Sequence, residues 1–130
     1  MAFFSLNLIN IINIMLKVLE LFSGTHSVGK VAKELGWDVV SLDLELPADH
    51  QIDIMNFDYK QYPKDTFDIV WASPPCTYYS NLQNCWLGRK KKDGIILTKE
   101  LLEEQRKDSD KLIRKTLEII NYFNPEYWFM

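Results

Sequence analysis

Asp68-Ile-Val-Trp-Ala-Ser-Pro-Pro-Cys-Thr-Tyr-Tyr-Ser80 is the stretch of sequence that decides the fold. An apolar run from Phe67 to Trp71 leads through small residues and two prolines to Cys76. The apolar run predicts a buried strand. The prolines predict a stiff loop, because each fixes its own φ and favours an extended residue before it. Ligands of open α/β sheets bind at the carboxyl ends of the strands, so Cys76 is a candidate nucleophile. A small buried apolar residue is the alternative interpretation of this cysteine.

The composition indicates one soluble domain. The chain has 130 residues, of which 47% are hydrophobic and 25% are charged, which suffices for a single core. Its net charge of -3 excludes a global basic field that would attract nucleic acid or a membrane surface, so a polyanion must be held by a local patch. Cys76 and Cys85 lack the spacing of a zinc site or a disulfide scaffold. They favour a reducing, cytoplasmic setting.

The first sixteen residues differ from the rest of the chain because they carry no charge. They are too few and too rich in asparagine for a membrane span, and they lack the basic start and the cleavage site of a signal peptide. We expect residues 1–16 to be an over-called extension, with Met15 as the natural start, and residues 17–130 to form the domain. A short helix packed on the sheet is the alternative.

The first half of the chain predicts alternating strands and helices. Short β-type runs occupy residues 18–22 and 39–43, and apolar residues at helical spacing lie between them over 28–35. A third strand is predicted over residues 51–54. Together with the strand at 67–71, these segments have the pattern of a doubly wound α/β fold.

One glycine and two carboxylates mark a candidate ligand site at the strand ends. Gly24 permits a tight turn and a close approach of the backbone to a ligand. Asp43 closes the second strand 19 residues later, near the spacing of an acidic residue that binds ribose hydroxyls. Asp53 closes the third predicted strand, and we expect it to face the same crevice. Many βαβ units carry a glycine turn and an acidic residue for structural reasons alone, which is the alternative.

Residues 77–92 follow the cysteine and predict a mobile loop. They contain tyrosines, asparagines and four consecutive cations, Arg89 to Lys92, which suit contacts with phosphates and stacking on bases. A solvated loop whose charges only maintain solubility is the alternative. Helical spacing then runs from 98 to 123, where Asp108-Ser109-Asp110 predicts a cap that divides the segment into two helices. A fifth strand is predicted to begin at Tyr127.

Over residues 17–130, this ordered set of motifs resembles the N-terminal half of the S-adenosylmethionine-dependent DNA cytosine-5 methyltransferases. Phe22-Ser23-Gly24 looks like the cofactor loop of that family, Asp43 like its ribose carboxylate, and Asp53-Ile54 like its adenine-contacting step. Pro74-Pro75-Cys76, with Tyr79 and Ser80, is similar to its catalytic loop and is the most specific motif of the set.

The resemblance implies a fold, a cofactor and a reaction. The fold is a Rossmann-like, doubly wound, mostly parallel sheet of the class I methyltransferases, incomplete at the C-terminus. S-adenosylmethionine is the implied cofactor, and double-stranded DNA is the implied substrate. Cys76 is the implied nucleophile, which adds to a flipped-out cytosine before methyl transfer to C5. The implied cofactor-binding residues are Phe22, Ser23, Gly24, Thr25, Asp43, Asp53, Ile54 and Pro74. The implied DNA-binding residues are Tyr79, Ser80, Arg89, Lys90 and Lys91.

Two departures from the family pattern stand out. His26 and Ser27 replace two glycines that usually follow the cofactor loop, and we expect His26 to be a loop residue rather than a base. In the family, the strand that begins at Pro125 leads to a Glu-Asn pair, and an arginine motif and a target-recognition region follow later. The sequence stops before these features, so we expect a longer form or a second chain to supply them.

Two other functions stay open. Methyltransferases that act on the exocyclic nitrogen of cytosine or adenine place a polar residue, two prolines and an aromatic residue after the fourth strand. Ser73-Pro74-Pro75 fits that pattern, but Cys76 stands where the aromatic residue is expected, so methylation of carbon is preferred. The second alternative is a non-catalytic remnant that binds cofactor or DNA, or that serves only as a folded interaction module.

Overall fold

A computed structural model describes residues 16–130, without the side chains of residues 81 and 82. The chain divides into two compact units, Met1–Ser73 with Lys115–Met130 and Pro74–Arg114. We call the described part of the first the sheet unit and the second the loop unit. The prediction that residues 1–16 are an over-called extension falls, apart from residue 16, outside the described residues.

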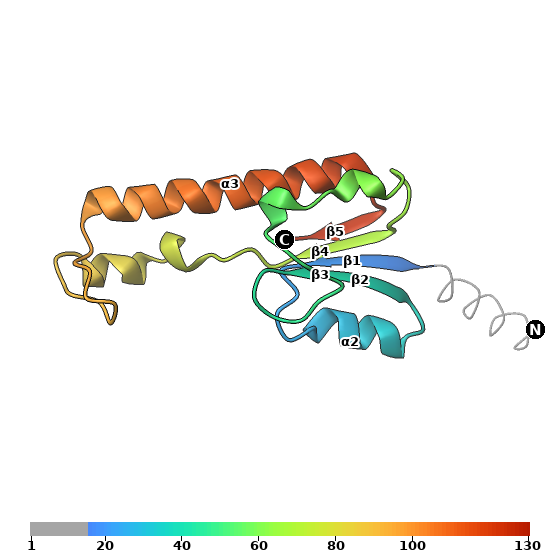
Figure 1. Cartoon of the computed structure of the whole chain (residues 1–130), viewed down its shortest axis with the longest axis horizontal. Helices are drawn as coiled ribbons and strands as arrows, with labels where there is room; N and C mark the ends of the chain where they lie inside the picture. Colours follow the sequence, from blue (N-terminus) through green and yellow to red (C-terminus); the bar gives the residue numbers. More distant parts are fainter. Residues whose placement is uncertain (1–15) are drawn as a thin grey trace, which may run out of the picture. The chain divides into compact units, whose positions relative to one another are not determined.

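The sheet unit contains a five-stranded sheet with the order β3-β2-β1-β4-β5 (Figure 1). All the pairings between neighbouring strands are parallel. This order and this parallel pairing are those of the doubly wound, Rossmann-like fold, so the predicted fold class is confirmed. The strands are β1 (Lys17–Leu21), β2 (Asp38–Asp43), β3 (His50–Gln51), β4 (Ile69–Ala72) and β5 (Tyr127–Phe129).

Helices cover both faces of this sheet. Figure 1 shows α2 (Ser27–Glu34) on one face and the C-terminal part of α3 (Lys99–Phe123) on the other. On the α3 face, the Phe123 ring packs edge-on against Phe67 with ring centroids 4.9 Å apart, and Phe123 is fully buried. The core of the sheet unit is therefore an α/β/α sandwich.

A glycine ends α2. Gly36 has a φ of +82°, and its N–H donates to the carbonyl of Lys33 at 3.0 Å. The N–H of Trp37 donates to the carbonyl of Ala32 at 3.0 Å. These two bonds form a Schellman motif, which satisfies carbonyl groups that the end of a helix leaves free. The chain then turns directly into β2.

The third strand is shorter than predicted. It ends at Gln51, and the residues from Ile54 to Asn56 form a 3-10 turn, η1, instead. Asp53 causes the change, because its Oδ1 accepts a hydrogen bond from the Met55 N–H at 2.9 Å and so caps the turn. A second 3-10 turn, η2 (Tyr59–Gln61), follows.

The helix before β5 is continuous, and the prediction that it divides at Asp108-Ser109-Asp110 is wrong. None of the three side chains is free to cap a helix. Asp108 pairs with Lys111 at 3.2 Å, Ser109 is buried, and Asp110 accepts a hydrogen bond from the Tyr79 hydroxyl. Among residues 16–130, each helix is too short or too polar to span a lipid bilayer.

Candidate active site

The carboxyl ends of β1, β2 and β4 lie together at one edge of the sheet. In the register of the sheet, Leu21 of β1 is paired with Leu42 of β2 and with Ala72 of β4. The strand order reverses between β1 and β4, and ligands of doubly wound folds bind at such a switch point. The residues that follow these strands, including Phe22 and Ser73, therefore define the candidate site of the sheet unit.

The turn after β1 has an unusual backbone. Phe22, Gly24 and His26 have positive φ angles of 56°, 53° and 62°. A left-handed conformation is uncommon for a bulky residue such as Phe22 and costs free energy that the surrounding structure must supply. Hydrogen bonds hold the turn, from the Ser23 N–H to the Leu42 carbonyl at 2.9 Å and from the His26 N–H to the Ser23 carbonyl at 2.8 Å. The turn is therefore organised before any ligand arrives.

Gly24 and His26 have structural roles in this turn. A Cβ atom on Gly24 would meet no atom within 4 Å, so the positive φ angle, rather than crowding, favours glycine there. Nε2 of His26 donates a hydrogen bond to the Pro47 carbonyl at 2.6 Å. Thr25 is exposed, with its hydroxyl 3.5 Å from that of Ser27.

Asp43 joins the end of β2 to this turn. Its Oδ2 accepts from the Gly24 N–H at 2.8 Å, and its Oδ1 accepts from the N–H groups of Glu45 at 3.0 Å and Leu46 at 2.8 Å. Desolvation raises the pKa of Asp43, but these hydrogen bonds and nearby His26 outweigh it, so the pKa lies below its usual value. A carboxylate offers about four lone-pair positions. Oδ2 therefore accepts one hydrogen bond among the described residues and Oδ1 accepts two.

Glu20 is a residue of the site that the sequence analysis missed. It lies in β1 with 2% of its surface exposed, and its Oε2 has no hydrogen-bond partner among the described residues. Burial raises the pKa of this carboxyl, although the amides of Val28 and Gly29 act against the rise. A Cβ atom on Gly29 would lie 2.4 Å from Oε2, so α2 approaches the carboxylate closely because residue 29 is a glycine. The sequence did contain a signal for Glu20, because it is a charged residue within the apolar run at 18–22.

Ser23 is a second buried polar residue at this edge. Its side chain is buried, and its hydroxyl has no hydrogen-bond partner among the described residues. Asp53 lies half-buried beyond β3, with its Oδ1 engaged by Met55. The Ile54 side chain is buried in the core.

Cys76 lies in the loop unit, where it precedes the 3-10 turn η3 (Thr77–Tyr79). Its side chain is a free thiol and is exposed, unlike that of a core cysteine. The Cys76 carbonyl accepts from the Tyr79 N–H at 3.1 Å, which fixes the start of the turn. Pro74, predicted to bind the cofactor, also belongs to the loop unit.

Hydrogen bonds attach η3 to α3 within the loop unit. The Tyr79 hydroxyl donates to the Asp110 carboxylate and lies 3.1 Å from the Arg106 carbonyl oxygen. The hydrogen bond to Asp110 raises the pKa of Tyr79. Arg106 Nε donates to the Tyr78 carbonyl at 2.7 Å. The hydroxyl of Tyr79, a predicted DNA-binding residue, is thus engaged inside the unit, whereas Ser80 is exposed.

The stretch predicted as a loop after Cys76 contains ordered turns. The 3-10 helix η4 (Asn81–Trp86) leads into a hairpin over residues 88–97. The Gly88 N–H donates to the Leu97 carbonyl at 2.7 Å, and the Lys91 N–H donates to the Ile95 carbonyl at 2.9 Å. Leu97 is fully buried and anchors the hairpin. Of the four predicted cations, Arg89, Lys90 and Lys91 lie on its first arm and Lys92 lies in its turn.

A comparison with known proteins shows what the chain is similar to. Over 113 residues, the chain is 40% identical to a protein of frog virus 3 (isolate Goorha) named as a probable DNA (cytosine-5)-methyltransferase. The chain is related to the DNA cytosine-5 methyltransferases. The resemblance drawn from Pro74-Pro75-Cys76 is thereby confirmed. The matched residues are 85% of this chain and 50% of the relative, so the chain spans about half the length of that relative. No family model and no solved structure matches the chain.

The sheet unit brings together part of the cofactor site that the resemblance to DNA cytosine-5 methyltransferases predicts. Gly24 and Asp43 are in direct contact, and Ser23 adjoins them. Asp53 is not hydrogen-bonded to this group in the described residues, and its role in the site stays a prediction, as do those of Cys76 and the cations of the loop unit.

Proposed function

We propose that this chain binds S-adenosylmethionine and methylates C5 of cytosine in double-stranded DNA, with Cys76 as the nucleophile. The observation that carries the proposal is the polar group at the end of β1. There the Asp43 carboxylate binds the Gly24 amide, and the buried Glu20 has an oxygen without a hydrogen-bond partner in the described part of the chain. The identity to a probable DNA (cytosine-5)-methyltransferase supports the same reaction.

The polar groups at this strand end fit the chemistry of S-adenosylmethionine. That cofactor has ribose hydroxyls and an ammonium group, and its sulfonium supplies the methyl group. Asp43 Oδ2 can accept from a ribose hydroxyl, and the Glu20 carboxylate can balance a positive group. Buried polar atoms normally have hydrogen-bond partners, so a ligand would supply the partners that Glu20 Oε2 and Ser23 Oγ lack among the described residues. The other residues proposed to contact the cofactor are Phe22, Thr25, Asp53, Ile54 and Pro74.

Cys76 would activate the cytosine ring. C5 of cytosine is a poor nucleophile, and addition of the Cys76 thiolate to C6 makes C5 resemble an enamine carbon that can take a methyl group. Loss of the C5 proton then breaks the bond between sulfur and C6 and releases the thiolate. The exposure of Cys76 supports this role, because a base flipped out of the duplex must reach the sulfur.

The cations of the hairpin would hold the DNA backbone. Arg89, Lys90 and Lys91 lie next to one another on one arm of the hairpin, so they can contact adjacent phosphates. Ser80 and Tyr79 follow Cys76 closely in the loop unit and would contact the backbone beside the flipped base. A local basic patch of this kind is needed because the whole chain has a net charge of -3.

Calorimetric titration of the 130-residue chain with S-adenosylmethionine tests the cofactor site. We expect saturable binding by the wild type and an affinity about ten-fold lower or more for Asp43→Ala, because a hydrogen bond to a charged group contributes about 1.5–3 kcal/mol. Asp38→Ala, which removes an exposed carboxylate from the start of β2, is the matched control. If the folded wild type did not bind S-adenosylmethionine, the proposed cofactor site would be rejected. If Asp43→Ala and the wild type bound it with equal affinity, Asp43 would not be part of that site.

DNA that contains 5-fluorocytosine tests the nucleophile, because fluorine at C5 blocks the final elimination and retains the covalent adduct. We expect an adduct that survives denaturing electrophoresis with the wild type and with Cys85→Ser. Cys76→Ser should form none. An unchanged yield in Cys76→Ser would place the nucleophile elsewhere. A wild type that binds S-adenosylmethionine but forms no adduct would favour a non-catalytic cofactor-binding chain.

A further inference from the structure

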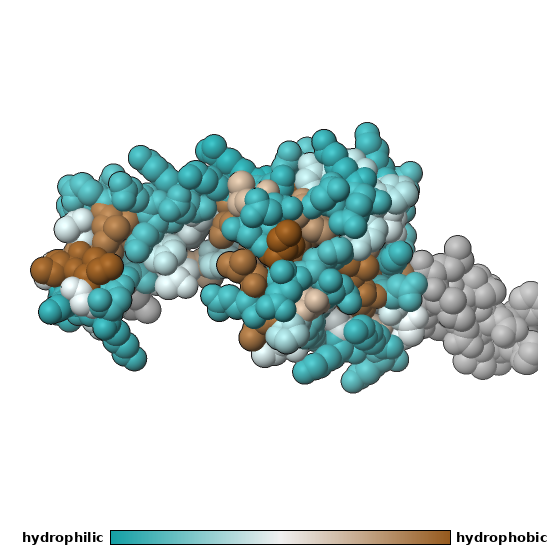
Figure 2. All heavy atoms as spheres, in the orientation of Figure 1, coloured by the Kyte–Doolittle hydropathy of each residue, from teal (hydrophilic) through white to brown (hydrophobic). Residues whose placement is uncertain are grey.

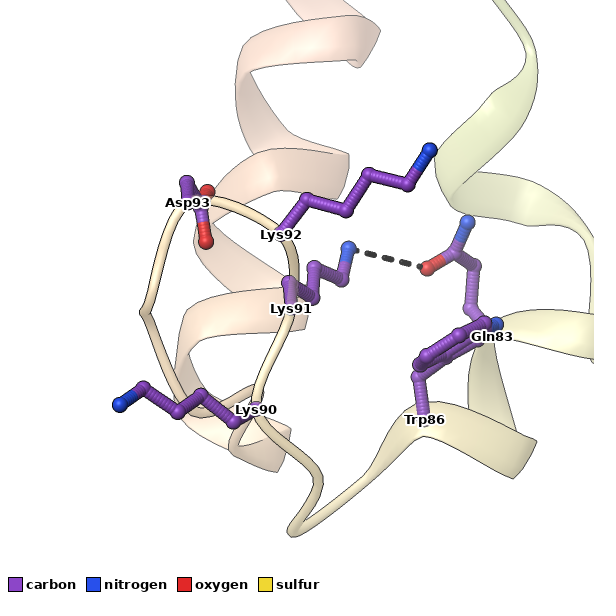
Figure 3. Close-up of a pocket in the computed structure, with 6 residues that line it drawn as sticks. All are labelled: Gln83, Trp86, Lys90, Lys91, Lys92 and Asp93. Carbon is purple, nitrogen blue, oxygen red and sulfur yellow. Dashed lines mark hydrogen bonds between the residues drawn. The ribbon is translucent and has the colours of Figure 1, made fainter.

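A hollow of about 570 Å³ lies in the loop unit, between η4 and the basic arm of the hairpin (Figure 3). It is separate from Cys76, which does not line it. Its lining residues are one tryptophan, one glutamine, three lysines and one aspartate, and the Lys90 side chain extends away from Trp86 and Gln83 (Figure 3). The lining residues are Gln83, Trp86, Lys90, Lys91, Lys92 and Asp93.

Trp86 presents its indole ring to this hollow. Its side chain is 47% exposed, although tryptophan is highly buried on average in folded proteins. In Figure 3 the ring stands beside Gln83 and across open space from the backbone of the lysines. The ring is therefore accessible for stacking.

The three lysines give the hollow a positive charge that no ion pair in the described part of the chain neutralises. Lys90 and Lys92 make no ion pair there, and Lys91 Nζ donates to Gln83 Oε1 at 3.4 Å. Asp93 supplies the opposite charge, but its Oδ1 accepts from the Ile95 N–H at 3.0 Å and stabilises the turn. With three cations and one carboxylate, the lining attracts anions.

We propose that this hollow binds an unpaired nucleotide of a nucleic acid, with the base stacked on Trp86 and the flanking phosphates at Lys90 and Lys92. Every base has an aromatic face that can stack on an indole, and phosphates are anions. The faces of bases inside a duplex are covered by their neighbours, so the hollow discriminates in favour of unpaired strands. S-adenosylmethionine does not suit it, because its sulfonium and ammonium groups would meet three lysines.

This inference rests on the proposed function, since it adds an unpaired segment of the DNA to the substrate that the chain contacts. Flipping a base out of a duplex leaves unpaired nucleotides beside the reaction site. Figure 2 shows apolar residues beside hydrophilic ones at the hairpin of the loop unit, and Ile95 and Ile96 are both more than half exposed there. The hairpin therefore offers apolar and cationic contacts to such a strand.

Fluorescence anisotropy with the full chain, without cofactor, tests the proposal. The probes are a labelled single strand of about 12 thymidines, within the range of known single-strand site sizes, and a duplex of the same length. We expect Trp86→Leu to weaken single-strand binding about 5- to 150-fold, the measured range for loss of one stacked base. Trp86→Phe should retain most of the affinity, and duplex binding should change less than single-strand binding in Trp86→Leu.

A salt series tests the cations independently of the tryptophan. Lys90→Ala and Lys92→Ala should each lower the slope of log K against log salt for the single strand by about 0.7, because each removes one phosphate contact. Lys107→Ala, which removes an exposed lysine on α3 outside the hollow, is the matched control and should leave the slope unchanged. Circular dichroism of each variant excludes loss of the fold as the cause.

Two results would overturn the inference. One is single-strand affinity in Trp86→Leu equal to that of the wild type, and the other is an equal loss for single strand and duplex. The assay separates this inference from the proposed function, because it requires neither S-adenosylmethionine nor Cys76. The chain could bind single strands through Trp86 and yet fail to bind S-adenosylmethionine. That result would support the proposed nucleotide site in the hollow and reject the methyltransferase proposal.

Discussion

Glu20 places a carboxyl group in the middle of β1, where Leu19 and Leu21 on either side are fully buried. Burial of a carboxylate disfavours its charged form, and the amide groups at the start of α2 offset only part of that cost. A buried charge that weakens the free protein is reasonable where a positive ligand later compensates it. The pH dependence of stability can test this interpretation directly.

Glu20→Gln should be more stable than the wild type at pH 7. Because the pKa of Glu20 is raised in the folded protein, protonation favours the fold below the unfolded value of about 4.5, and this contribution is lost as pH rises through the folded pKa. Urea unfolding at pH 4 and pH 7 measures the difference, which should be small at pH 4 and larger at pH 7. Equal differences at both pH values would contradict the prediction.

Asp43→Asn should have the opposite pH dependence. The pKa of Asp43 is lowered in the folded protein, so its carboxylate stabilises the fold above the unfolded value of about 3.8 and loses this effect as pH falls through the folded pKa. The variant should therefore be less stable than the wild type at pH 7 and approach it below pH 4. Asp38→Asn, at the exposed start of β2, is the control. If Asp43→Asn were as much less stable than the wild type below pH 4 as at pH 7, the charge of Asp43 would not be what stabilises the fold.

At the residue scale, the sequence predicts groups whose signal is local. Gly24, Asp43 and Cys76 were predicted as site residues from a turn, a spacing and a pair of prolines. Glu20 was missed because a single charge in an apolar run does not reveal which element will cover it. Its significance depends on the approach of Gly29, which only the packing of α2 on β1 shows.

Among the elements, α3 shows where local patterns fail. Asp108-Ser109-Asp110 has the composition of a helix cap, yet the helix passes through it, and Asp110 accepts a hydrogen bond from Tyr79, which is 31 residues away. A contact at that separation leaves no trace in a window of one or two helical turns. The strands at 17–21 and 69–72 were predicted within two residues, because each contains a short, largely apolar run with the length of a strand in a parallel sheet.

Tyr79→Phe should loosen η3 without unfolding α3. The substitution removes only the hydroxyl that donates to Asp110, while the contact of Arg106 Nε with the Tyr78 carbonyl stays in place. Hydrogen exchange measured by mass spectrometry should show faster exchange over residues 77–80 and unchanged exchange in β1. Tyr127→Phe, in the exposed strand β5, controls for the loss of a tyrosine hydroxyl. Unaltered exchange over residues 77–80 would show that the hydroxyl does not hold the turn.

On the scale of the whole molecule, the order of elements could be predicted from the sequence, but which apolar residues are exposed at the surface could not. The alternation of strands with helix or loop fixes a doubly wound sheet, as the order β3-β2-β1-β4-β5 confirms. The helical spacing of Val31 and Leu35 suggests that both face the core. In the structure they are 55% and 46% exposed, because among residues 16–130 α2 covers β1 and β2 and leaves β4 and β5 open on that face.

The open face forms an apolar hollow of about 540 Å³ in the sheet unit. Rings from β4 and β5 form part of its wall, with Trp71 and Phe129 centroids 5.1 Å apart. An exposed apolar concavity of this size is expected to take up apolar ligands. The lining residues are Leu16, Val18, Ser27, Val28, Val31, Ala32, Leu35, Trp37, Ile69, Trp71, Tyr127 and Phe129.

The native protein should therefore bind the dye 8-anilinonaphthalene-1-sulfonate at pH 7, and Val31→Gln should bind it more weakly. The substitution places a polar amide in the wall of the hollow, and the exposure of Val31 means that the fold tolerates it. Leu46→Gln is the matched control, because Leu46 is similarly exposed but lies outside the hollow. Dye titration followed by fluorescence, with circular dichroism to confirm the fold, measures the effect. If the native wild type does not bind the dye, or if Val31→Gln and Leu46→Gln bind it equally, the hollow is not an accessible apolar surface in solution.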